Sequence, residues 1–337
     1  MALRKIIGLG MAFLLGASMA FGSEKVTKPT NPTVPTQTES KTSKKKDKPA
    51  EMPVQKTTPK PEPKPKPPIQ SSPSNESQPQ NEPRQERIET DGITYSLNWN
   101  NYTAEVSKAD QNITTANIPA SVTVSGKNFK VTSIGDRVFS GCESLTSINI
   151  PNSVTSIGMR VFYDCKNLTS IVIPSSVTSI GEYAFSGCEN LTSINIPNSV
   201  ASIRYRVFND CISLTSIEIP SSVTSIGGCA FENCKNLTSV NIPNSVTSIG
   251  DWAFDNCESL TSVTIPNSVT SIGKYAFNRC ESLMSVKCYA NKPPVLGNNA
   301  VFYKNPSQSI LYIPKGMKEV YQNAAGWKDF KTIIDNL

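Results

Sequence analysis

Cysteines and carboxylates hold most of the chemical capacity of this sequence, because the chain has no histidine. Without histidine, the Ser-His-Asp and Cys-His arrangements of nucleophilic catalysis cannot form, and imidazole-containing zinc sites are excluded. The side chain that most often transfers protons near neutral pH is also missing. Paired carboxylates or a lysine remain as options for catalysis. We expect a protein that is not an enzyme and that binds no cofactor, metal or small-molecule substrate.

Seven of the nine cysteines share one repeated position. They recur every 23 residues, at Cys142, Cys165, Cys188, Cys211, Cys234, Cys257 and Cys280. Neighbouring rungs of such a column would lie about 5 Å apart, but parallel side chains would strain a disulfide. We favour a ladder of small, buried, free thiols; disulfides, typical of cysteine-rich exported chains, are the alternative. Cys229 and Cys288 lie outside the column, and we expect Cys229 to be exposed and reactive.

The same period governs other residue types. Phenylalanine recurs at Phe139, Phe162, Phe185, Phe208, Phe231, Phe254 and Phe277. Proline recurs at Pro151, Pro174, Pro197, Pro220, Pro243 and Pro266. A fixed period in the twenties predicts a solenoid, in which each repeat is one coil stacked on its neighbours.

Each repeat unit contains the spacing of a leucine-rich repeat. Leu145, Ile148 and Ile150 follow the L-x-x-L-x-L pattern and predict a short strand, which Pro151 ends because proline lacks a ladder donor. Further along, Val154 and Ile157 face inward from a second extended piece. The positions equivalent to Val161, Phe162 and Cys165 predict a tight helical turn that closes the coil. Residues 131–287 should therefore form stacked coils with one continuous parallel strand ladder.

Both ends of such a stack need caps, since an open strand ladder exposes unpaired backbone groups. Residues 91–130 form the expected N-terminal cap, with a hairpin indicated by the alternation of Ile93, Tyr95, Leu97 and Trp99. Residues 288–337 form the expected C-terminal cap. It contains a degraded coil, a final strand over 310–314 and a helical tail with Trp327, Phe330 and Ile334. The predicted fold is a β-rich leucine-rich-repeat solenoid with 23-residue coils, a parallel ladder, short helical turns and two caps.

The first 90 residues differ from the rest. Residues 1–22 resemble a signal peptide, with Arg4 and Lys5 before an apolar stretch and small residues after it. The apolar stretch is shorter than the ~20 residues of a membrane span, so a cleaved signal is favoured over an anchor. Residues 23–90 hold 14 of the 25 prolines and predict a disordered spacer. We expect an exported protein, extracellular or at the cell surface, without a membrane span after cleavage.

Net charge argues against nucleic acid as a partner. The chain carries +6 overall, but residues 91–337 contain 18 basic and 18 acidic residues. A nucleic-acid-binding domain usually carries its basic excess on the folded part, which is neutral here.

Two exposed columns of the predicted solenoid are candidates for binding a partner. The strand face is polar and small, without a carboxylate pair, and consists of Asn149, Val172, Asn195, Glu218, Asn241, Thr264 and Lys287. The turn stripe precedes the core phenylalanines and consists of Arg137, Arg160, Tyr183, Arg206, Cys229, Trp252 and Tyr275. Arg, Tyr and Trp dominate interface hot spots, so the six stripe residues other than Cys229 form the candidate binding surface. The alternative is that these side chains only cover the turns.

The repeat string S-V-T-S-I-G-x-x-A/V-F-x-x-C-x-x-L-T-S-I/V-x-I-P resembles the BspA-type leucine-rich repeat family. The resemblance covers roughly residues 88–337, including the insertion 124–130 and the closing segments 311–314 and 326–330. It implies an exported surface protein, since family members occur on bacteria and some parasitic protists. Some of them bind host matrix or plasma proteins, promote attachment or engage innate receptors.

These observations together predict an adhesin-like binding protein with a protein partner from the host or the cell envelope. A structural envelope component without a specific ligand is the alternative.

Overall fold

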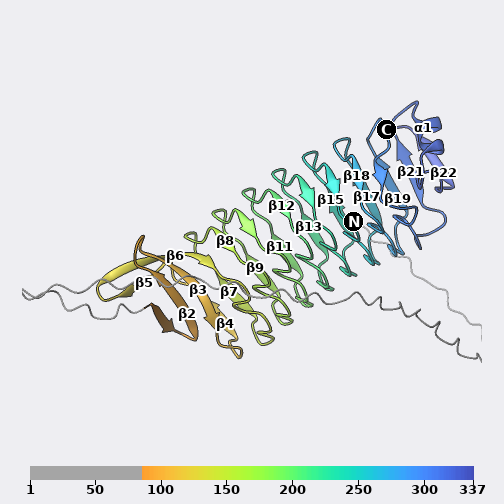
Figure 1. Cartoon of the computed structure of the whole chain (residues 1–337). Helices are drawn as coiled ribbons and strands as arrows, with labels where there is room; N and C mark the ends of the chain where they lie inside the picture. The colour runs from red at the N-terminus through yellow and green to blue at the C-terminus, as the bar shows by residue number, and fades with distance from the viewer. Residues whose placement is uncertain (1–85) are drawn as a thin grey trace, which may run out of the picture. The chain divides into compact units, whose positions relative to one another are not determined.

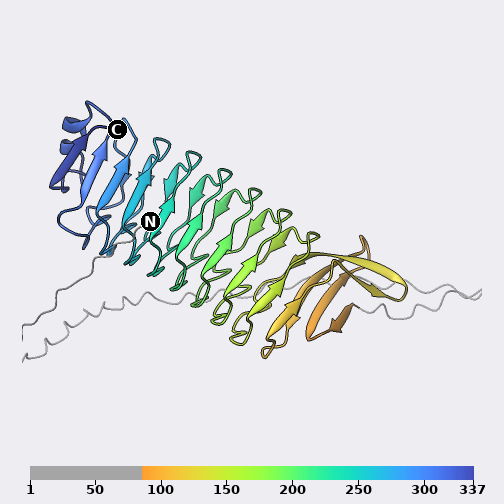
Figure 2. The ribbon, with the colours of Figure 1, turned by 180° about the vertical axis from the view of Figure 1, so that it is seen from behind.

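The computed structural model describes residues 86–337, which lie within one unit of the chain. The predicted signal peptide, and the predicted spacer up to residue 85, lie outside the described residues. Within the unit, the 23-residue repeats stack as successive coils, seen from two sides in Figures 1 and 2. We number coils 1 to 7 by their phenylalanines, from Phe139 in coil 1 to Phe277 in coil 7. The predicted stacking is confirmed.

The first strand ladder is formed by the S-I-N segments of the repeat. Its main part is an eight-stranded parallel sheet. The strands are β9 (Ser170–Val172), β11 (Ser193–Asn195), β13 (Ser216–Glu218), β15 (Ser239–Asn241), β17 (Ser262–Ile265), β19 (Ser285–Cys288), β21 (Ile310–Ile313) and β22 (Thr332–Asp335). Coil 1 contributes β7 (Ser147–Asn149), which pairs with β4 (Thr115–Asn117) and not with β9.

A second ladder runs along the S-I-G segments. It joins β6 (Lys127–Ile134), β8 (Ser156–Ile157) and β10 (Ser179–Ile180) to the N-terminal sheet. A separate five-stranded sheet continues it with β12 (Ser202–Ile203), β14 (Ser225–Ile226), β16 (Ser248–Ile249), β18 (Ser271–Ile272) and β20 (Val295–Leu296). The prediction of one continuous ladder was therefore wrong: there are two, and each is interrupted once within the described coils.

The third side of each coil is a turn segment. The sequence predicted a helical turn here, and the structure does not contain one. Its backbone bonds to the next coil, as in Phe162 N–H to Ala184 O at 2.8 Å and Phe208 N–H to Ala230 O at 2.9 Å. The second residue of every such turn has a left-handed φ, for example 55° at Arg160. A right-handed helical turn requires negative φ throughout, so hydrogen-bonded turns replace the helix.

The core is continuous from cap to cap, as predicted. The phenylalanines of successive coils stack with ring centroids 5.1 to 5.6 Å apart, and Phe302 of the C-terminal cap extends the column. Leu145 and Val154 and their equivalents are buried around this stack. One coil could not bury these groups alone, so the stack stabilises each coil through its neighbours.

The N-terminal cap is built on the predicted hairpin, β2 (Ile93–Asn98) with β3 (Thr103–Ala109). β3 pairs in parallel with β6, which also pairs antiparallel with β5 (Ser121–Val124). The last residues of the predicted spacer form a strand instead, β1 (Arg87–Thr90), antiparallel to β2. The Asp91-Gly92 dipeptide between them is a favoured tight hairpin connection, and it extends the cap by one edge strand.

The C-terminal cap contains the predicted final strand, β21, but a shorter helix than expected. The helix α1 spans Lys318–Asn323. Trp327 follows it in a turn, Phe330 comes directly after that turn, and Ile334 lies on β22 rather than on a helix. Trp327 is buried and its indole N–H donates to Pro294 O at 2.9 Å. The prediction of a helical tail was thus wrong for these three residues.

The interruption of the second ladder coincides with a change in the repeat. The corner after each S-I segment is glycine, except for Arg204 in coil 4. A Cβ atom on Gly250 would lie 2.5 Å from Gly228 N, and one on Gly273 would lie 2.3 Å from Asp251 N. Coils with glycine can therefore approach closely, and a residue with a side chain cannot.

The hydrogen bonds at this junction are lost accordingly. Gly227 N–H donates to Ile203 O at 2.7 Å. Within the described residues, no such bond joins Arg204 N–H to Ile180 O, or Ala201 N–H to Thr178 O. Coils 3 and 4 are consequently unpaired along the second ladder.

Candidate interaction surface

The turn stripe has an unusual backbone. All seven of its residues adopt left-handed φ values between 53° and 59°. Residues other than glycine, asparagine and aspartate rarely do so, because Cβ crowds the following carbonyl oxygen. The solenoid turn thus imposes this conformation on Arg, Tyr and Trp side chains in coil after coil.

A second left-handed column lies four positions later in each turn, and it differs in composition. We call it the Asx column; it consists of Gly141, Asp164, Gly187, Asp210, Asn233, Asn256, Arg279 and Lys304. Its first six residues are the types that tolerate this backbone best. Conformational preference therefore explains most of the Asx column and does not explain the turn stripe.

The stripe forms a stacked cluster in coils 2 to 4. The Arg160 guanidinium of coil 2 lies 4.6 Å from the ring centroid of Tyr183 in coil 3. The Arg206 guanidinium of coil 4 lies 5.9 Å from the same centroid. Tyr183 also packs edge-on against Tyr205, with centroids 5.4 Å apart, and Tyr163 packs against Tyr183 at 6.5 Å. We call these five residues the Arg-Tyr cluster. Cation–π and aromatic contacts hold their side chains in defined positions.

Coil 5 accommodates this cluster with small residues. Gly228 lies under Tyr205: an added Cβ would be 3.2 Å from Cδ2 of that ring. The neighbouring stripe residue, Cys229, is only 3% exposed, so the prediction that it is exposed was wrong. The Arg206 side chain and Glu232 lie beside its thiol, which explains why it is covered.

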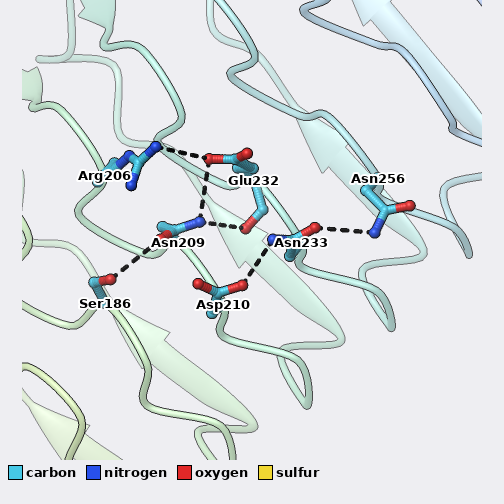
Figure 3. Close-up of polar contacts among 7 residues, drawn as sticks. All are labelled: Ser186, Arg206, Asn209, Asp210, Glu232, Asn233 and Asn256. Atoms are coloured by element: carbon cyan, nitrogen blue, oxygen red, sulfur yellow. Dashed lines mark hydrogen bonds and ion pairs between the residues drawn. The ribbon is translucent and has the colours of Figure 1, made fainter. Parts of the chain in front are cut away.

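Arg206 also lies at one end of a set of polar contacts on the turns, drawn in Figure 3. Its Nη2 lies 3.7 Å from Glu232 Oε2. The Asn209 amide donates to Glu232 at 3.3 Å and its Oδ1 accepts from Ser186 Oγ at 3.3 Å. Beside it, Asn233 Nδ2 donates to Asp210 at 2.7 Å and Asn233 Oδ1 accepts from Asn256 at 2.9 Å. These bonds connect consecutive coils, so polar groups of the turns support the stack.

The stripe resumes beyond coil 5 as a second, separate pair. The rings of Trp252 and Tyr275 stack 5.7 Å apart and within 11° of parallel. Trp252 is 38% exposed and Tyr275 is half-buried. Arg137, at the N-terminal end of the stripe, is exposed and has none of these stacking partners within the described residues. The predicted stripe is therefore two stacked groups with an isolated arginine at one end.

The strand face is flat and chemically sparse. Its residues are exposed except for Thr264, which is half-buried, and Val172 is 74% exposed. Asn149 donates to Asn117 Oδ1 at 2.8 Å. The adjacent threonines are engaged within the fold, as in Thr192 Oγ1 donating to Thr169 O at 3.2 Å. This face offers a partner few large or positioned side chains.

The cysteine column has a structural role that the sequence pattern did not reveal. All nine cysteines are buried and free in the described residues. Each column thiol from coil 2 onward points at a phenylalanine carbonyl of the preceding coil, as in Cys188 Sγ to Phe162 O at 3.1 Å. Burial raises the pKa of the Cys188 thiol well above its ordinary value. The prediction of buried thiols is confirmed, and the contacts add a weak inter-coil bond to space filling.

A groove of about 720 Å³ follows the glycine corners of the first coils, from Glu105 to Arg204. Two carboxylates on its rim are already engaged: Glu105 accepts from Ser133 Oγ at 3.1 Å, and Asp136 accepts from Met159 N–H at 2.7 Å. In the part of the chain that the structure describes, no three potential metal ligands cluster, and no helix is both long and apolar enough to cross a membrane.

Sequence reasoning missed Tyr163, Arg204 and Tyr205. None of them belongs to the stripe column, yet Tyr163 and Tyr205 pack on Tyr183. The sequence did contain one usable signal, because Arg204 occupies the position where the other six coils have glycine. A break in an otherwise strict column is visible without a structure.

Comparisons with known proteins agree with this architecture. The model of the BspA type leucine rich repeat region matches in six copies, over residues 109–234 and 201–328. No curated protein matches the sequence.

Among solved structures, a leucine rich cell surface protein from Faecalibacterium prausnitzii is 36% identical with a TM-score of 0.56. The match covers 62% of this chain and 56% of that protein, so this chain spans little more than half of its length. A leucine rich repeat protein from T. pallidum is 28% identical with a TM-score of 0.51, over 58% of this chain and 90% of that one. Because the repeat model covers most of the chain, this protein belongs to the BspA-type leucine-rich repeat family.

Proposed function

We propose that this protein is an exported, adhesin-like surface protein that binds a host or envelope protein through its turn stripe. A leucine-rich repeat solenoid is typically a non-enzymatic scaffold for protein interaction. Its stacked coils align one position of the repeat into a continuous surface column. The relative from F. prausnitzii is described as a cell surface protein, which supports the proposed location.

The left-handed backbone of the stripe carries this proposal. A non-glycine residue in that region costs roughly 1 to 2 kcal/mol relative to an ordinary conformation, and such outliers concentrate at functional sites. Arg160, Tyr183 and Arg206 adopt it and stack on one another. Stacking restricts these side chains before a partner arrives, which lowers the entropy lost on binding. The strand face has no comparable feature.

Paired alanine substitutions in the full chain test the proposal. One variant combines Arg206→Ala with Trp252→Ala, which removes one residue from each stacked group. The matched control combines Asn195→Ala with Asn241→Ala on the strand face. Binding to immobilised fibrinogen, fibronectin and epithelial cells is measured for both. Loss of a hot-spot residue typically costs more than about 1 kcal/mol, so we expect the stripe variant to bind at least tenfold more weakly and the control to bind normally.

Thermal unfolding of both variants establishes that they remain folded, since none of the removed side chains lies in the phenylalanine core. If only the strand-face pair loses binding, the interaction site lies on that face and the stripe assignment is wrong. Absence of saturable binding by the unaltered chain to any of these probes would favour the structural envelope component instead.

A further inference from the structure

Charge is distributed unevenly along the turn side of the solenoid. We consider the glycine corner and the two residues after it, which are 135–137, 158–160, 181–183 and 204–206 in coils 1 to 4. These positions contain Arg137, Arg160, Arg204 and Arg206, and their acidic residues are Asp136 and Glu182. The same positions in coils 5 to 7 contain one lysine and one aspartate. The N-terminal half of the stripe is therefore basic and the C-terminal half is neutral.

The basic half is also incompletely neutralised by its surroundings. None of the ion pairs within residues 86–337 involves Arg160 or Arg204. Arg206 is only loosely paired, 3.7 Å from Glu232. Of the two acidic residues, Asp136 already accepts a backbone hydrogen bond from Met159. An arriving anion thus meets guanidinium groups whose donors are not used up by carboxylates of the same chain.

Coil 4 is the last coil of this half and contains two of its four arginines, and its sequence departs from the repeat at the corner, where Arg204 stands in place of glycine. Tyr205 and Arg206 follow Arg204, while the next coil has Gly228 and Cys229 at the two corresponding positions. The missing side chain of Gly228 leaves room for the Tyr205 ring, and Cys229 lies under Arg206. Bulky residues in one coil are thus matched by small ones in the next. The junction between coils 3 and 4 loses backbone bonds in the same place.

From these observations we infer that the Arg-Tyr cluster, with Arg204, recognises an acidic segment of the partner protein, rich in aspartate and glutamate. Guanidinium groups bind carboxylates through paired hydrogen bonds. The Arg160 guanidinium is already oriented by its contact with Tyr183 at 4.6 Å, so less freedom is lost when a carboxylate binds. This inference rests on the proposed function and specifies the partner of the same surface.

Binding of fluorescein-labelled poly-L-glutamate to the full chain, followed by fluorescence anisotropy, tests the inference. The variant Arg160→Gln with Arg204→Gln removes two exposed or half-buried charges outside the core. The control Lys274→Gln with Arg279→Gln removes the same charge from coil 7. We expect the first variant to bind at least tenfold more weakly and the control to bind within twofold of the unaltered chain. Raising NaCl from about 0.05 to about 0.5 M should weaken binding further, since salt screens exposed charges.

Three outcomes overturn the inference. The first is no binding of poly-L-glutamate, and the second is an equal loss of affinity in both variants. The third is tighter binding of hyaluronate than of poly-L-glutamate at the same cluster, which would assign the site to an acidic polysaccharide. The two proposals can fail separately. If Arg206→Ala with Trp252→Ala abolishes binding to the host proteins while poly-L-glutamate binding is insensitive to the arginines, the stripe is the site but its partner is not selected by acidity. If instead poly-L-glutamate binding depends on the arginines while Arg206→Ala with Trp252→Ala leaves host-protein binding intact, the cluster is an anion site and the proposed function is wrong.

Discussion

The two left-handed columns of the turns experience the same backbone constraint and are filled differently. In the Asx column, Asn233 and Asn256 combine a tolerant conformation with side-chain bonds between coils. In the turn stripe, Tyr183 and Trp252 adopt the same region with nearly the same φ and contact their neighbours mainly through their rings, Tyr183 edge-on and Trp252 stacked. The fold thus selects the residue type in one column and leaves it open in the other. Large, rigid side chains in the open column are where selection for binding can act.

The largest expected effect concerns the core that fixes both columns. Phe208 lies between Arg206 and Asp210, fully buried between two stacked rings. Replacing Phe208 by alanine should cost about 3 to 5 kcal/mol, because the cavity is only partly filled by relaxation. Hydrogen exchange should increase most in coils 3 to 5, since contacts in a solenoid are between neighbours. Unchanged hydrogen exchange in these coils would mean that the Phe208 ring does not hold the turns in place.

The next largest effect is the difference in stability loss between a substitution in the Asx column and one in the turn stripe. Asn233→Ala removes two inter-coil hydrogen bonds at 2.7 and 2.9 Å, and alanine tolerates the left-handed region poorly, so we expect a loss of about 2 kcal/mol. Arg160→Ala leaves the backbone cost unchanged and removes one half-exposed cation–π contact, so its loss should stay below about 1 kcal/mol. Urea unfolding midpoints measure both. Equal losses would mean that the stripe, like the Asx column, exists for stability.

The smallest effect concerns Cys229, the buried stripe residue. Burial and the charge of Glu232 raise the pKa of its thiol, against the opposing effect of Arg206. The thiolate therefore forms at higher pH than that of an exposed cysteine, and alkylation should still be accelerating at about pH 9. Cys234, in the interior column, should react more slowly still, because it is wholly buried and donates to Phe208 O. Peptide mapping after iodoacetamide treatment compares the two; faster reaction at Cys234 would contradict this order.

Periodic residues made most of the fold predictable. Phe162, Leu145 and Val154 recur with one spacing, and a period of that length has few packing solutions other than stacked coils. The turn conformation was not predictable from the same pattern, because Val161, Phe162 and Cys165 fit a helical turn equally well. Only the backbone of the neighbouring coil, which accepts from Phe162 N–H, decides against the helix.

The candidate surface was only partly predictable, for a related reason. Column membership identifies residues that share an environment, so the sequence placed Arg160, Tyr183 and Arg206 in one column, and their side chains are in contact. Contacts between columns depend on the direction in which long side chains extend. The spacing of residues in the repeat does not determine that direction. Tyr205 joins the cluster because Gly228 makes room for it, and Cys229 is covered because Arg206 lies beside it.

The missing backbone bonds beside Arg204 bear on how the molecule unfolds. In a linear array, stability is approximately the sum of each coil's own contribution and the coupling to its two neighbours. Where one coupling is weaker, cooperativity is divided at that point. We expect coils 1 to 3 with the N-terminal cap, and coils 4 to 7 with the C-terminal cap, to behave as two cooperative blocks joined through the core and the first ladder. The Arg-Tyr cluster lies across their boundary, so a bound partner would fasten the two blocks together.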